Sequence, residues 1–487
     1  MKKIQNYING DLVEPKSGNY FDNVSPVNGE VYSMIPDSDI DDINDAVKSA
    51  KEAFFSWSKL SKKQRYDHIM HLADEIENHF DELVKAESKD NGKPEWLARS
   101  VDIPRASENF RFFATASLHF DSEIHEMDGK AINYTLRQPI GVAGCISPWN
   151  LPIYLLTWKI SPALVAGNTV VAKPSEVTPM TSYIFSQICQ KVNFPKGVIN
   201  IVHGYGNKAG DALSRHPDVP IISFTGGTST GEKIAASAAP MFKKLSLELG
   251  GKNPNIIFED ADFDDAVKMS AKAAFSNQGQ ICLCGSRLFI QESIYENFKN
   301  AIIKETESFI VGNPKDESSN LGAVVSKEHM EKILKCIERA KKEGGKILVG
   351  GKRLILEGEL KNGYYIEPTI IDGLSVDCET NKEEIFGPVV SMIPFKTEEE
   401  VINMANSTKY GLSASLFTKD VSRSHRVAAK IDSGVVVSII TIGSFSTNIG
   451  SAILDLVGGI DSILLLTRTC EYETLRKCVP TLALFVT

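Results

Sequence analysis

The spacing of hydrophobic positions predicts that the first third of the chain is mostly helical. Ile43, Val47, Ala50 and Phe54 follow one another at intervals of four, three and four residues, which places them on one face of a helix. Residues 64–83 continue in the same manner. We interpret the three histidines of this stretch as ordinary helix positions, because no cysteine or carboxylate pattern joins them.

From residue 141 onward, short apolar runs alternate with helical stretches. This alternation is typical of β-α-β units, in which helices cover a mostly parallel sheet. Sheets of this kind bind their ligands at the carboxyl ends of the strands. A second α/β stretch follows from about residue 261 to residue 433. The predicted strands of the first stretch are residues 141–146, 169–172, 198–202, 221–224, 245–247 and 255–258.

Length and composition indicate a soluble globular protein with more than one domain. A chain of 487 residues is too long for one ordinary hydrophobic core, so we expect two or three domains. The 42% of hydrophobic and 24% of charged residues are typical of a soluble globular protein and exclude a disordered or collagen-like chain. The net charge of −9, without any basic run, argues against binding to nucleic acid or to an anionic membrane.

The cysteines and the apolar segments indicate the cellular compartment in which we expect the protein. The 8 cysteines are spread thinly, which favours free thiols in a reducing compartment over a disulfide framework. The N-terminus lacks the apolar core of a signal peptide, so we expect a cytoplasmic protein. Residues 434–454 carry no charge and have the length of a bilayer span, but their seven Ser, Thr and Asn side chains argue against a membrane segment.

One cysteine has a setting that suits catalysis. Cys282 follows a helix rich in alanine and phenylalanine and a turn with Gly279, a context that can expose a thiol among backbone N–H groups. Cysteine is a strong nucleophile, although only a few per cent of a free thiol is ionised at neutral pH. A buried structural cysteine is the alternative, and the pattern is also compatible with a Cys–His protease, whose histidine can be distant in sequence. Only Cys282 and Cys284 are closely spaced, and nothing completes a zinc site, so we expect no metal.

Two further segments carry groups that could assist a nucleophile. Glu248 ends an apolar strand just before two glycines, where apolar surroundings raise proton affinity and favour a general base. Asn150 lies in a loop fixed by two prolines, and its amide could donate to an oxyanion. The alternatives are a strand-end glutamate that faces solvent and an ordinary proline-rich loop.

Two strand ends carry features of a cofactor site. Lys173 ends one strand, and Glu176 follows it closely. Residues 224–231 leave another strand and open a helix, and their glycines let a diphosphate approach the backbone N–H groups at the positive helix end. Residues 204–210 resemble the glycine-rich dinucleotide fingerprint, but they are one residue too long and lack its acidic partner, so we interpret them as a turn.

Taken together and in this order, these segments resemble the aldehyde dehydrogenase superfamily from roughly Asn6 to Ser433. The resemblance implies an α/β fold with a Rossmann-type NAD-binding domain, an α/β catalytic domain and a small bridging or oligomerisation hairpin. It implies residues 1–120 and 140–250 for the NAD-binding domain, 121–139 for the bridging segment, 251–436 for the catalytic domain and 437–487 for an atypical tail. The matching motifs are Ser147-Pro-Trp-Asn150, Lys173-Pro-Ser-Glu176, Phe224-Thr-Gly-Gly-Thr-Ser-Thr-Gly231, Leu247-Glu-Leu-Gly-Gly251, Asn277-Gln-Gly-Gln-Ile-Cys282 and Glu384-Ile-Phe-Gly-Pro388.

The resemblance also implies a mechanism. Cys282 attacks the aldehyde carbon, while the Asn150 side chain and the backbone N–H of Cys282 hold the oxyanion. Hydride passes to NAD⁺ and leaves a thioester, which water activated by Glu248 releases as the acid. The lack of a histidine near Cys282 fits this scheme, because the group that leaves is hydride and not an amine.

For the cofactor, the resemblance assigns Lys173 and Glu176 to the adenosine ribose. Glu176 would accept from a free 2′-hydroxyl and repel a 2′-phosphate, so NAD is expected in preference to NADP. Glu384 would hold the nicotinamide ribose, and Phe386 would pack near the nicotinamide ring. The other positions implied for cofactor binding are Ile146, Ser147, Pro148, Trp149, Ser175, Phe224, Thr225, Gly226, Gly227, Gly231 and Leu249.

Residues 109–113, 155–159 and 280–284 are most similar to family members that oxidise unsaturated dicarboxylate-type semialdehydes of tryptophan catabolism, such as 2-aminomuconate semialdehyde. A carboxylated substrate would suit Arg105 and Arg111, which the resemblance puts near the entrance of the substrate tunnel, because a guanidinium pairs bidentately with a carboxylate. The alternative for both is a surface helix arginine. The family also implies a homodimer or homotetramer.

After residue 436 the sequence departs from the family pattern. The family has a Trp-x-Asn strand, a substrate loop with an arginine and a Pro-Phe-Gly-Gly-x-Lys motif, of which only a Gly-Gly at residues 458–459 survives. The abrupt change indicates a shifted reading frame, an altered splice or a gene-model error, a hypothesis that resequencing the transcript would settle. Two alternatives to a working semialdehyde dehydrogenase follow. One is a non-catalytic relative that binds NAD, and the other is an enzyme for another aldehyde, such as betaine aldehyde.

Overall fold

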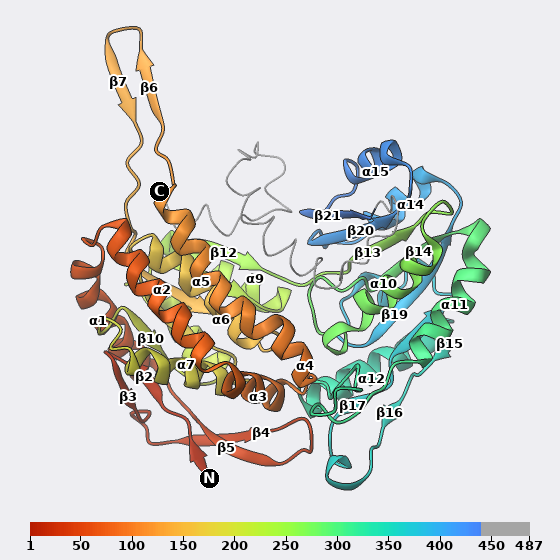
Figure 1. Cartoon of the computed structure of the whole chain (residues 1–487), viewed down its shortest axis with the longest axis horizontal. Coiled ribbons are helices and arrows are strands. Elements are labelled where there is room, and N and C mark those ends of the chain that lie inside the picture. The colour runs from red at the N-terminus through yellow and green to blue at the C-terminus, as the bar shows by residue number, and fades with distance from the viewer. Residues whose placement is uncertain (440–487) are drawn as a thin grey trace.

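The computed structural model of the protein describes residues 1–439, which form two α/β bodies side by side (Figure 1). Each body contains one seven-stranded sheet. We call residues 1–250, without the segment 121–139, the first body, and residues 251–439 the second body. The predicted α/β fold class with mostly parallel sheets is confirmed.

The sheet of the first body is parallel in its main part. Five strands run parallel, and β2 and β3 extend one edge in the antiparallel sense. Three of the central strands are buried along their whole length, which explains their continuous apolar runs. In order across the sheet, the strands are β12 (Lys244–Glu248), β11 (Ile221–Thr225), β8 (Val142–Ile146), β9 (Thr169–Lys173), β10 (Ile199–Ile201), β2 (Asn6–Ile8) and β3 (Asp11–Val13).

Helices cover both faces of this sheet. Val170 and Ala172 of β9 pack into one helical layer and Val171 into the other, because successive strand residues point to opposite faces. Ser61 and Gln64 form a capping box that fixes the start of α2. The larger layer contains α2 (Lys62–Asn78), α3 (Phe80–Asn91), α5 (Ile103–Leu118), α6 (Pro152–Val165) and α7 (Met180–Lys191), and the other contains α1 (Ile40–Trp57), α8 (Asp211–Arg215) and α9 (Thr228–Ala238).

The sheet of the second body is parallel except for β15 at its edge. Its strands, in order, are β15 (Lys346–Val349), β18 (Thr369–Asp372), β19 (Val389–Phe395), β14 (Arg287–Gln291), β13 (Pro254–Ile257), β20 (Ser413–Phe417) and β21 (Val435–Ile439). One face packs against α10 (Phe263–Phe275) and α11 (Tyr295–Glu307), and the other against α12 (Lys327–Lys342), α14 (Glu398–Ala405) and α15 (Val421–Ala428). The short elements α13 (Glu379–Lys382), β16 (Arg353–Leu354) and β17 (Tyr365–Ile366) complete this body.

All six predicted strands are present, but the last of them, residues 255–258, forms β13 of the second sheet. The first third is mostly helical, as predicted, but short strands precede its helices. These strands are short and mix buried with exposed residues, so they show neither helical spacing nor clean alternation. Besides β2 and β3, they are β1 (Lys2–Lys3), β4 (Tyr20–Val24) and β5 (Val31–Pro36), which form a sheet of their own.

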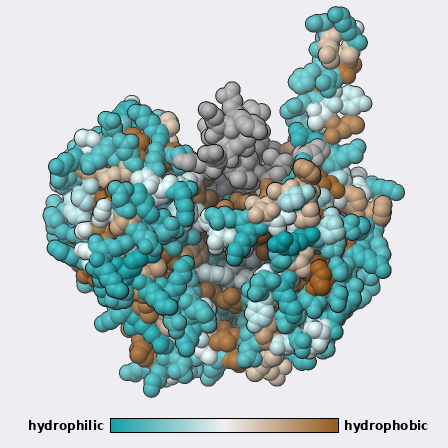
Figure 2. Space-filling model, turned by 180° about the vertical axis from the view of Figure 1, so that it is seen from behind, coloured by the Kyte–Doolittle hydropathy of each residue, from teal (hydrophilic) through white to brown (hydrophobic). Residues whose placement is uncertain are grey.

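A hairpin of β6 (Ile124–Met127) and β7 (Ala131–Tyr134) projects from the first body (Figure 1). Every residue of both strands is exposed, and Figure 2 shows apolar side chains on the hairpin. It lies within the predicted bridging segment, residues 121–139. No helix within residues 1–439 is long and apolar enough to cross a membrane. The uncharged segment 434–454 enters β21, and its remainder, like most of the predicted tail 437–487, lies outside the described residues.

Candidate active site

Cys282 lies in the loop that joins α10 to β14. After α10 ends, Asn277, Gln278 and Gly279 adopt left-handed φ values of 51°, 57° and 67°. Asparagine tolerates this conformation, whereas Gly279 is required, because a Cβ there would lie 2.1 Å from the carbonyl oxygen of Gly387. Cys282 follows this tight turn, and the residue as a whole is partly exposed.

The two closely spaced cysteines have different surroundings. Cys284 is buried, and burial raises the pKa of its thiol to about 12. Its sulfur lies 4.0 Å from the carbonyl oxygen of Ser276. Cys282 is more accessible, and its pKa is raised by burial and then by the negative charges of Glu384 and Glu248. A nucleophile must be reachable by its substrate, so the geometry favours Cys282, with two carboxylates near its sulfur.

The side chain of Asn150 is held against the loop of Cys282. Asn150 is buried, and its Nδ2 donates to the carbonyl oxygen of Gln280 over 3.0 Å. In return, Nδ2 of Asn277 donates to the carbonyl oxygens of Asn150, at 3.0 Å, and of Gln280, at 3.3 Å. An amide NH₂ carries two donors, and this bond to Gln280 uses one of them. The structure therefore brings two of the predicted catalytic residues together from different bodies.

Glu248 ends β12, opposite Thr225 at the end of β11. Lys159 of α6 is fully buried, and it lies close enough to Glu248 for their charges to interact. Burial lowers the pKa of Lys159 to about 8, against the opposing effects of Glu248 and Cys145. Its Nζ donates to the hydroxyl of Ser223 over 3.2 Å. Sequence reasoning missed Lys159, although a single charge in the otherwise uncharged helix α6 was a signal that could have found it.

Lys173 and Glu176 form an ion pair at the carboxyl end of β9. Nζ of Lys173 lies 2.6 Å from Oε2 of Glu176. Burial alone would raise the pKa of Glu176, but the charge and hydrogen bond of Lys173 outweigh it and lower this pKa. Oε1 of Glu176 accepts from the backbone N–H of Gly206 over 3.2 Å. Gly206 begins a π-helical turn, η2 (Gly206–Gly210), within the segment that we interpreted as a turn.

Neighbouring strand ends carry further polar groups. Ser147 follows β8 and Thr225 ends β11, and both hydroxyl oxygens are buried without a hydrogen-bond partner in the described part of the chain. Buried hydroxyls of this kind suit a polar ligand, and the start of α9 adds free backbone donors. Within α9, Gly231 packs closely against Leu249, because a Cβ there would lie 2.5 Å from Cδ2 and would force that side chain to shift. These groups fit a dinucleotide at the carboxyl ends of the first sheet.

The other first-body residues predicted for the cofactor lie at the same strand ends and helix start. They are Ile146 and Pro148 at the end of β8, Ser175 just beyond β9, and Phe224, Gly226 and Gly227 between β11 and α9.

The second body meets these groups with Glu384 and Phe386. Oε1 of Glu384 accepts from the backbone N–H of Gly251 over 2.9 Å, and burial raises the pKa of this carboxyl group. Phe386 has a φ of 60°, and its ring packs edge-on against Trp149 with 5.2 Å between ring centres. The His329 ring lies 5.0 Å from that of Trp149, and its Nε2 donates to the carbonyl oxygen of Phe386 over 2.6 Å. These aromatic contacts join the two bodies, and sequence reasoning missed His329.

The two predicted substrate arginines lie on α5 in different surroundings. The side chain of Arg105 is 13% exposed, and its Nη1 lies 3.5 Å from Oε2 of Glu108. Arg111 pairs with Asp74 at 2.7 Å and with Glu77 at 3.0 Å, both on α2. Arg111 therefore fastens α5 to α2, and its geometry gives no support to the predicted contact with a substrate carboxylate.

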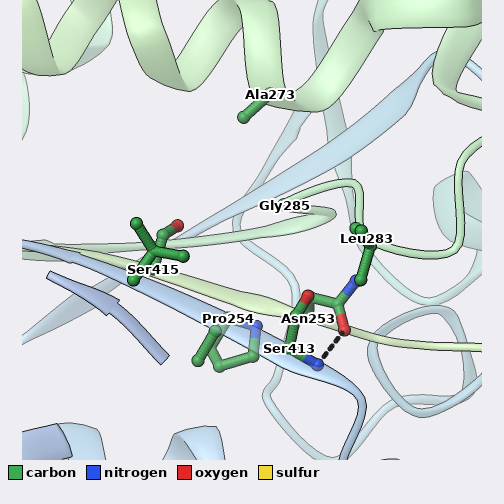
Figure 3. Close-up of a pocket in the computed structure, with 9 residues that line it drawn as sticks. Asn253, Pro254, Ala273, Leu283, Gly285, Ser413 and Ser415 are labelled. Carbon is green, nitrogen blue, oxygen red and sulfur yellow. Dashed lines mark hydrogen bonds between the residues drawn. The ribbon is translucent and has the colours of Figure 1, made fainter. Parts of the chain in front are cut away.

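A pocket lies beside Leu283 and Gly285, which follow Cys282 in the chain (Figure 3). Asn253 lines this pocket, and its Oδ1 accepts from the backbone N–H of Ser413 over 3.3 Å. Nδ2 of Asn253 donates to the carbonyl oxygens of Cys282, at 2.6 Å, and of Cys284, at 3.0 Å. Asn253 thus anchors the loop to the second sheet. Within residues 1–439, no group of three or more His, Cys, Asp or Glu side chains could hold a metal ion.

The sequence matches the aldehyde dehydrogenase family over residues 12–443, and the chain belongs to this family. Its members are NAD-dependent aldehyde oxidoreductases, so the predicted family, the class of enzyme and the NAD cofactor are all confirmed. Residues 444–487 lie outside the match.

Particular relatives are similar along most of their length. The chain is 49% identical to 2-aminomuconic semialdehyde dehydrogenase of Mus musculus over 436 residues, which are 89% of each chain. It is 42% identical to 2-hydroxymuconic semialdehyde dehydrogenase of Pseudomonas sp. (strain CF600), covering 90% of this chain and 91% of that one. Among solved structures, the NAD⁺ complex of aldehyde dehydrogenase from Bacillus cereus matches with a TM-score of 0.87 and 37% identity, over 91% of this chain and 90% of that one.

Proposed function

We propose that the protein oxidises a carboxylated semialdehyde, such as 2-aminomuconate semialdehyde, to the corresponding acid. One observation carries this proposal. The partly exposed Cys282, the Asn150 amide on its loop and the Glu248 carboxylate within electrostatic reach of the sulfur come together from remote stretches of the chain. The relatives named for 2-aminomuconic and 2-hydroxymuconic semialdehydes support the substrate class.

The proposed reaction begins with proton transfer. Glu248 takes the proton of Cys282, because burial and two carboxylates raise the pKa of this thiol and it ionises poorly by itself. The thiolate then forms a bond to the aldehyde carbon, and the carbonyl oxygen becomes an oxyanion. Nδ2 of Asn150 and the backbone N–H of Cys282 hold this oxyanion, and one such donor contributes roughly 10²–10³ in rate. Bound NAD⁺ supplies the hydride acceptor, and a thioester on Cys282 remains.

Release of the acid uses Glu248 a second time. After passing its first proton to solvent, Glu248 takes a proton from water, whose oxygen adds to the thioester carbon. The bond to sulfur breaks, Cys282 leaves as the thiolate, and the carboxylic acid is free. Lys159 lies within electrostatic reach of Glu248, and its positive charge would favour the carboxylate form that acts as the base.

We assign the cofactor to the strand ends of the first body. Lys173 and Glu176 would hold the adenosine ribose, the unpartnered hydroxyls of Ser147 and Thr225 would meet polar groups of the dinucleotide, and Glu384 would receive the nicotinamide ribose. The negative charge of Glu176 would repel a 2′-phosphate, which favours NAD over NADP. On this basis residues 1–120 and 140–250 form the NAD-binding domain, and residues 251–436 form the catalytic domain.

For the substrate carboxylate we favour Arg105 over Arg111. Arg105 is mostly buried, and its contact with Glu108, at 3.5 Å, is longer than those of Arg111 with Asp74 and Glu77, at 2.7 and 3.0 Å. A guanidinium withdrawn from water pairs strongly with a carboxylate.

We also propose that the hairpin in residues 121–139 joins copies of the chain into a homodimer or homotetramer in the cytoplasm. Ile124, Met127, Ile132 and Tyr134 expose their apolar side chains on it, and such a patch typically marks an interface. Light scattering after size-exclusion chromatography tests this, since replacement of all four by serine should yield monomers.

Purified full-length protein and a panel of aldehydes test the proposed activity. NADH formation should be fastest with carboxylated semialdehydes, slower with neutral aldehydes, and absent for Cys282→Ala. Preference for betaine aldehyde would instead support the alternative substrate. Binding of NAD without turnover of any aldehyde would support the non-catalytic relative and contradict our proposal.

A further inference from the structure

Lys93 is a buried lysine that the proposed reaction does not use. It follows α3, and its Nζ lies 2.8 Å from Oδ1 of Asp102 and 3.6 Å from Oε1 of Glu87. The side chains of all three residues are 0% exposed. Charges withdrawn this completely from water are retained only where each has a partner, and apolar residues of the same size often stabilise a fold as well. The cluster therefore calls for a reason other than stability.

Nζ of Lys93 also reaches the loop of Asn150. It donates to the carbonyl oxygen of Asn150 over 3.1 Å. The same oxygen accepts from Nδ2 of Asn91 at 3.3 Å and from Nδ2 of Asn277 at 3.0 Å. A carbonyl oxygen has two lone pairs. Three donors to this one oxygen, one of them charged, therefore use its full capacity to accept hydrogen bonds. The main chain of Asn150 is fixed from both bodies at once.

Two carboxylates share the single ammonium of this cluster. Burial raises the pKa of both Glu87 and Asp102, and the charge of Lys93 opposes this rise. The shorter contact of Nζ is with Asp102, at 2.8 Å against 3.6 Å for Glu87, so Asp102 is the carboxyl group that holds the ammonium. An ammonium has three hydrogens, which allows Nζ to donate to the carbonyl oxygen of Asn150 as well. Asp102 ends a π-helical turn, η1 (Ala98–Asp102), and such turns occur frequently at functional sites.

We propose that Lys93 is a positioning residue of the reaction: its ammonium, held by Asp102, fixes the main chain of Asn150 and so aims the Asn150 amide at the oxyanion. This inference rests on the proposed role of Asn150. A peptide that rotates at Asn150 would carry Nδ2 away from the place where the oxyanion forms. Because that donor acts mainly in the transition state, its displacement lowers kcat and leaves KM nearly unchanged.

The test is a double-mutant cycle on the full-length enzyme with Lys93→Met and Asn150→Ala. Methionine keeps the length of the side chain and removes the charge. We expect Lys93→Met alone to lower kcat by roughly 10- to 100-fold, below the full loss of the donor. In the Asn150→Ala background, the same substitution should change kcat by less than about twofold. Equal losses in both backgrounds would overturn the proposal, because Lys93 would then act independently of Asn150.

Tyr32→Phe is the matched control, since it removes a hydroxyl bonded to the buried Asp90 of α3 without touching Asn150. It should lower the melting temperature and leave kcat unchanged. If Lys93→Met does not fold, Asp102→Asn removes the counter-charge with less change of shape and enters the same cycle. A crystal structure of the variant gives a readout that does not depend on turnover. The Asn150 amide should move away from the Gln280 carbonyl, and an unmoved amide would contradict the proposal.

The aldehyde panel keeps this test separate from the proposed function. If the enzyme oxidises neutral aldehydes and not carboxylated ones, the substrate proposal fails and the cycle is run on a neutral aldehyde. If Asn150→Ala leaves kcat intact, the proposed mechanism fails, and the role of Lys93 fails with it. A loss in Asn150→Ala without a loss in Lys93→Met contradicts the role of Lys93 alone.

Discussion

The two sheets face the candidate active site with opposite ends of their strands. In the first body the polar groups come at the carboxyl ends of strands, with Lys173 on β9, Thr225 on β11 and Glu248 on β12. In the second body they come just before the amino ends of strands, with Cys282 ahead of β14 and Glu384 ahead of β19. The polar groups of the first body therefore lie at the end where parallel sheets commonly bind ligands, and those of the second body lie at the other end.

The difference changes how each side chain is held. At a strand end, the hydrogen-bond ladder fixes the backbone, and the side chain needs few other contacts. Cys282 lies in a loop, and specific bonds replace the ladder, such as those from Asn253 to the carbonyl oxygens around the thiol. We therefore expect substitutions in the second body to affect the chemistry, and those at the strand ends of the first body to affect the cofactor and the base.

The largest effect should separate the two cysteines of the second body. Cys282→Ala removes the nucleophile and should lower kcat by at least about a thousandfold. Cys284→Ala removes a buried thiol beyond the reacting atoms, so kcat should stay within about threefold, with a modest fall in melting temperature. Rates of NADH formation for both variants measure this difference. Similar losses in the two variants would contradict the assignment of Cys282 alone as the nucleophile.

A smaller effect should appear at β9 in the first body. Glu176→Gln removes the charge that would repel a 2′-phosphate and weakens the ribose contact. We expect KM for NAD to rise by roughly tenfold, and the preference for NAD over NADP to fall by roughly 10- to 100-fold, as for the loss of a charged hydrogen bond. Kinetics with both cofactors measure this. An unchanged preference for NAD over NADP would contradict the assignment of Glu176 to the adenosine ribose.

The two arginines of α5 offer a comparison within one helix. Arg105→Leu should raise KM for a carboxylated semialdehyde by about tenfold and leave KM for a neutral aldehyde unchanged. Arg111→Leu breaks a partly exposed ion-pair network and should change either KM by less than about twofold. The reverse ranking would assign the substrate carboxylate to Arg111.

The smallest effect concerns the pH dependence of acid release. Burial lowers the pKa of Lys159 to about 8, so Lys159 loses its proton as the pH rises through this value. Below it, the ammonium stabilises the Glu248 carboxylate and weakens it as a base, whereas above it Glu248 becomes a stronger base. The rate of thioester hydrolysis should therefore increase by about threefold across this pH. Rapid-quench kinetics should show no such step for Lys159→Met, and a step that persists in the variant belongs to another group.

Much of the fold was predictable because the first sheet is buried on both faces. Runs such as Val142–Ile146 and Thr169–Lys173 read directly as strands. The strands before α1 were not predictable, because their side chains have mixed exposure and no repeating pattern.

Within the candidate site, Asn150, Glu248 and Cys282 were predictable because each stands beside a proline or glycine signal and matches a family motif. Lys159 and Lys93 were not, because a buried charge depends on partners that are distant in sequence. Lys93 and Asn150, for example, meet only in the folded chain. The hydrogen bond from the backbone N–H of Gly206 to Glu176 was missed for the same reason, because the two residues are distant in sequence.

The contact between Gly279 and Gly387 has a consequence for engineering. A single added methyl group at Gly279 would strike the main chain that leads from Glu384 into β19. The Cys282 loop and the segment that follows Glu384 are therefore packed tightly against each other. A library meant to admit bulkier aldehydes at the proposed site should leave this junction intact and vary the side chains of α5 instead.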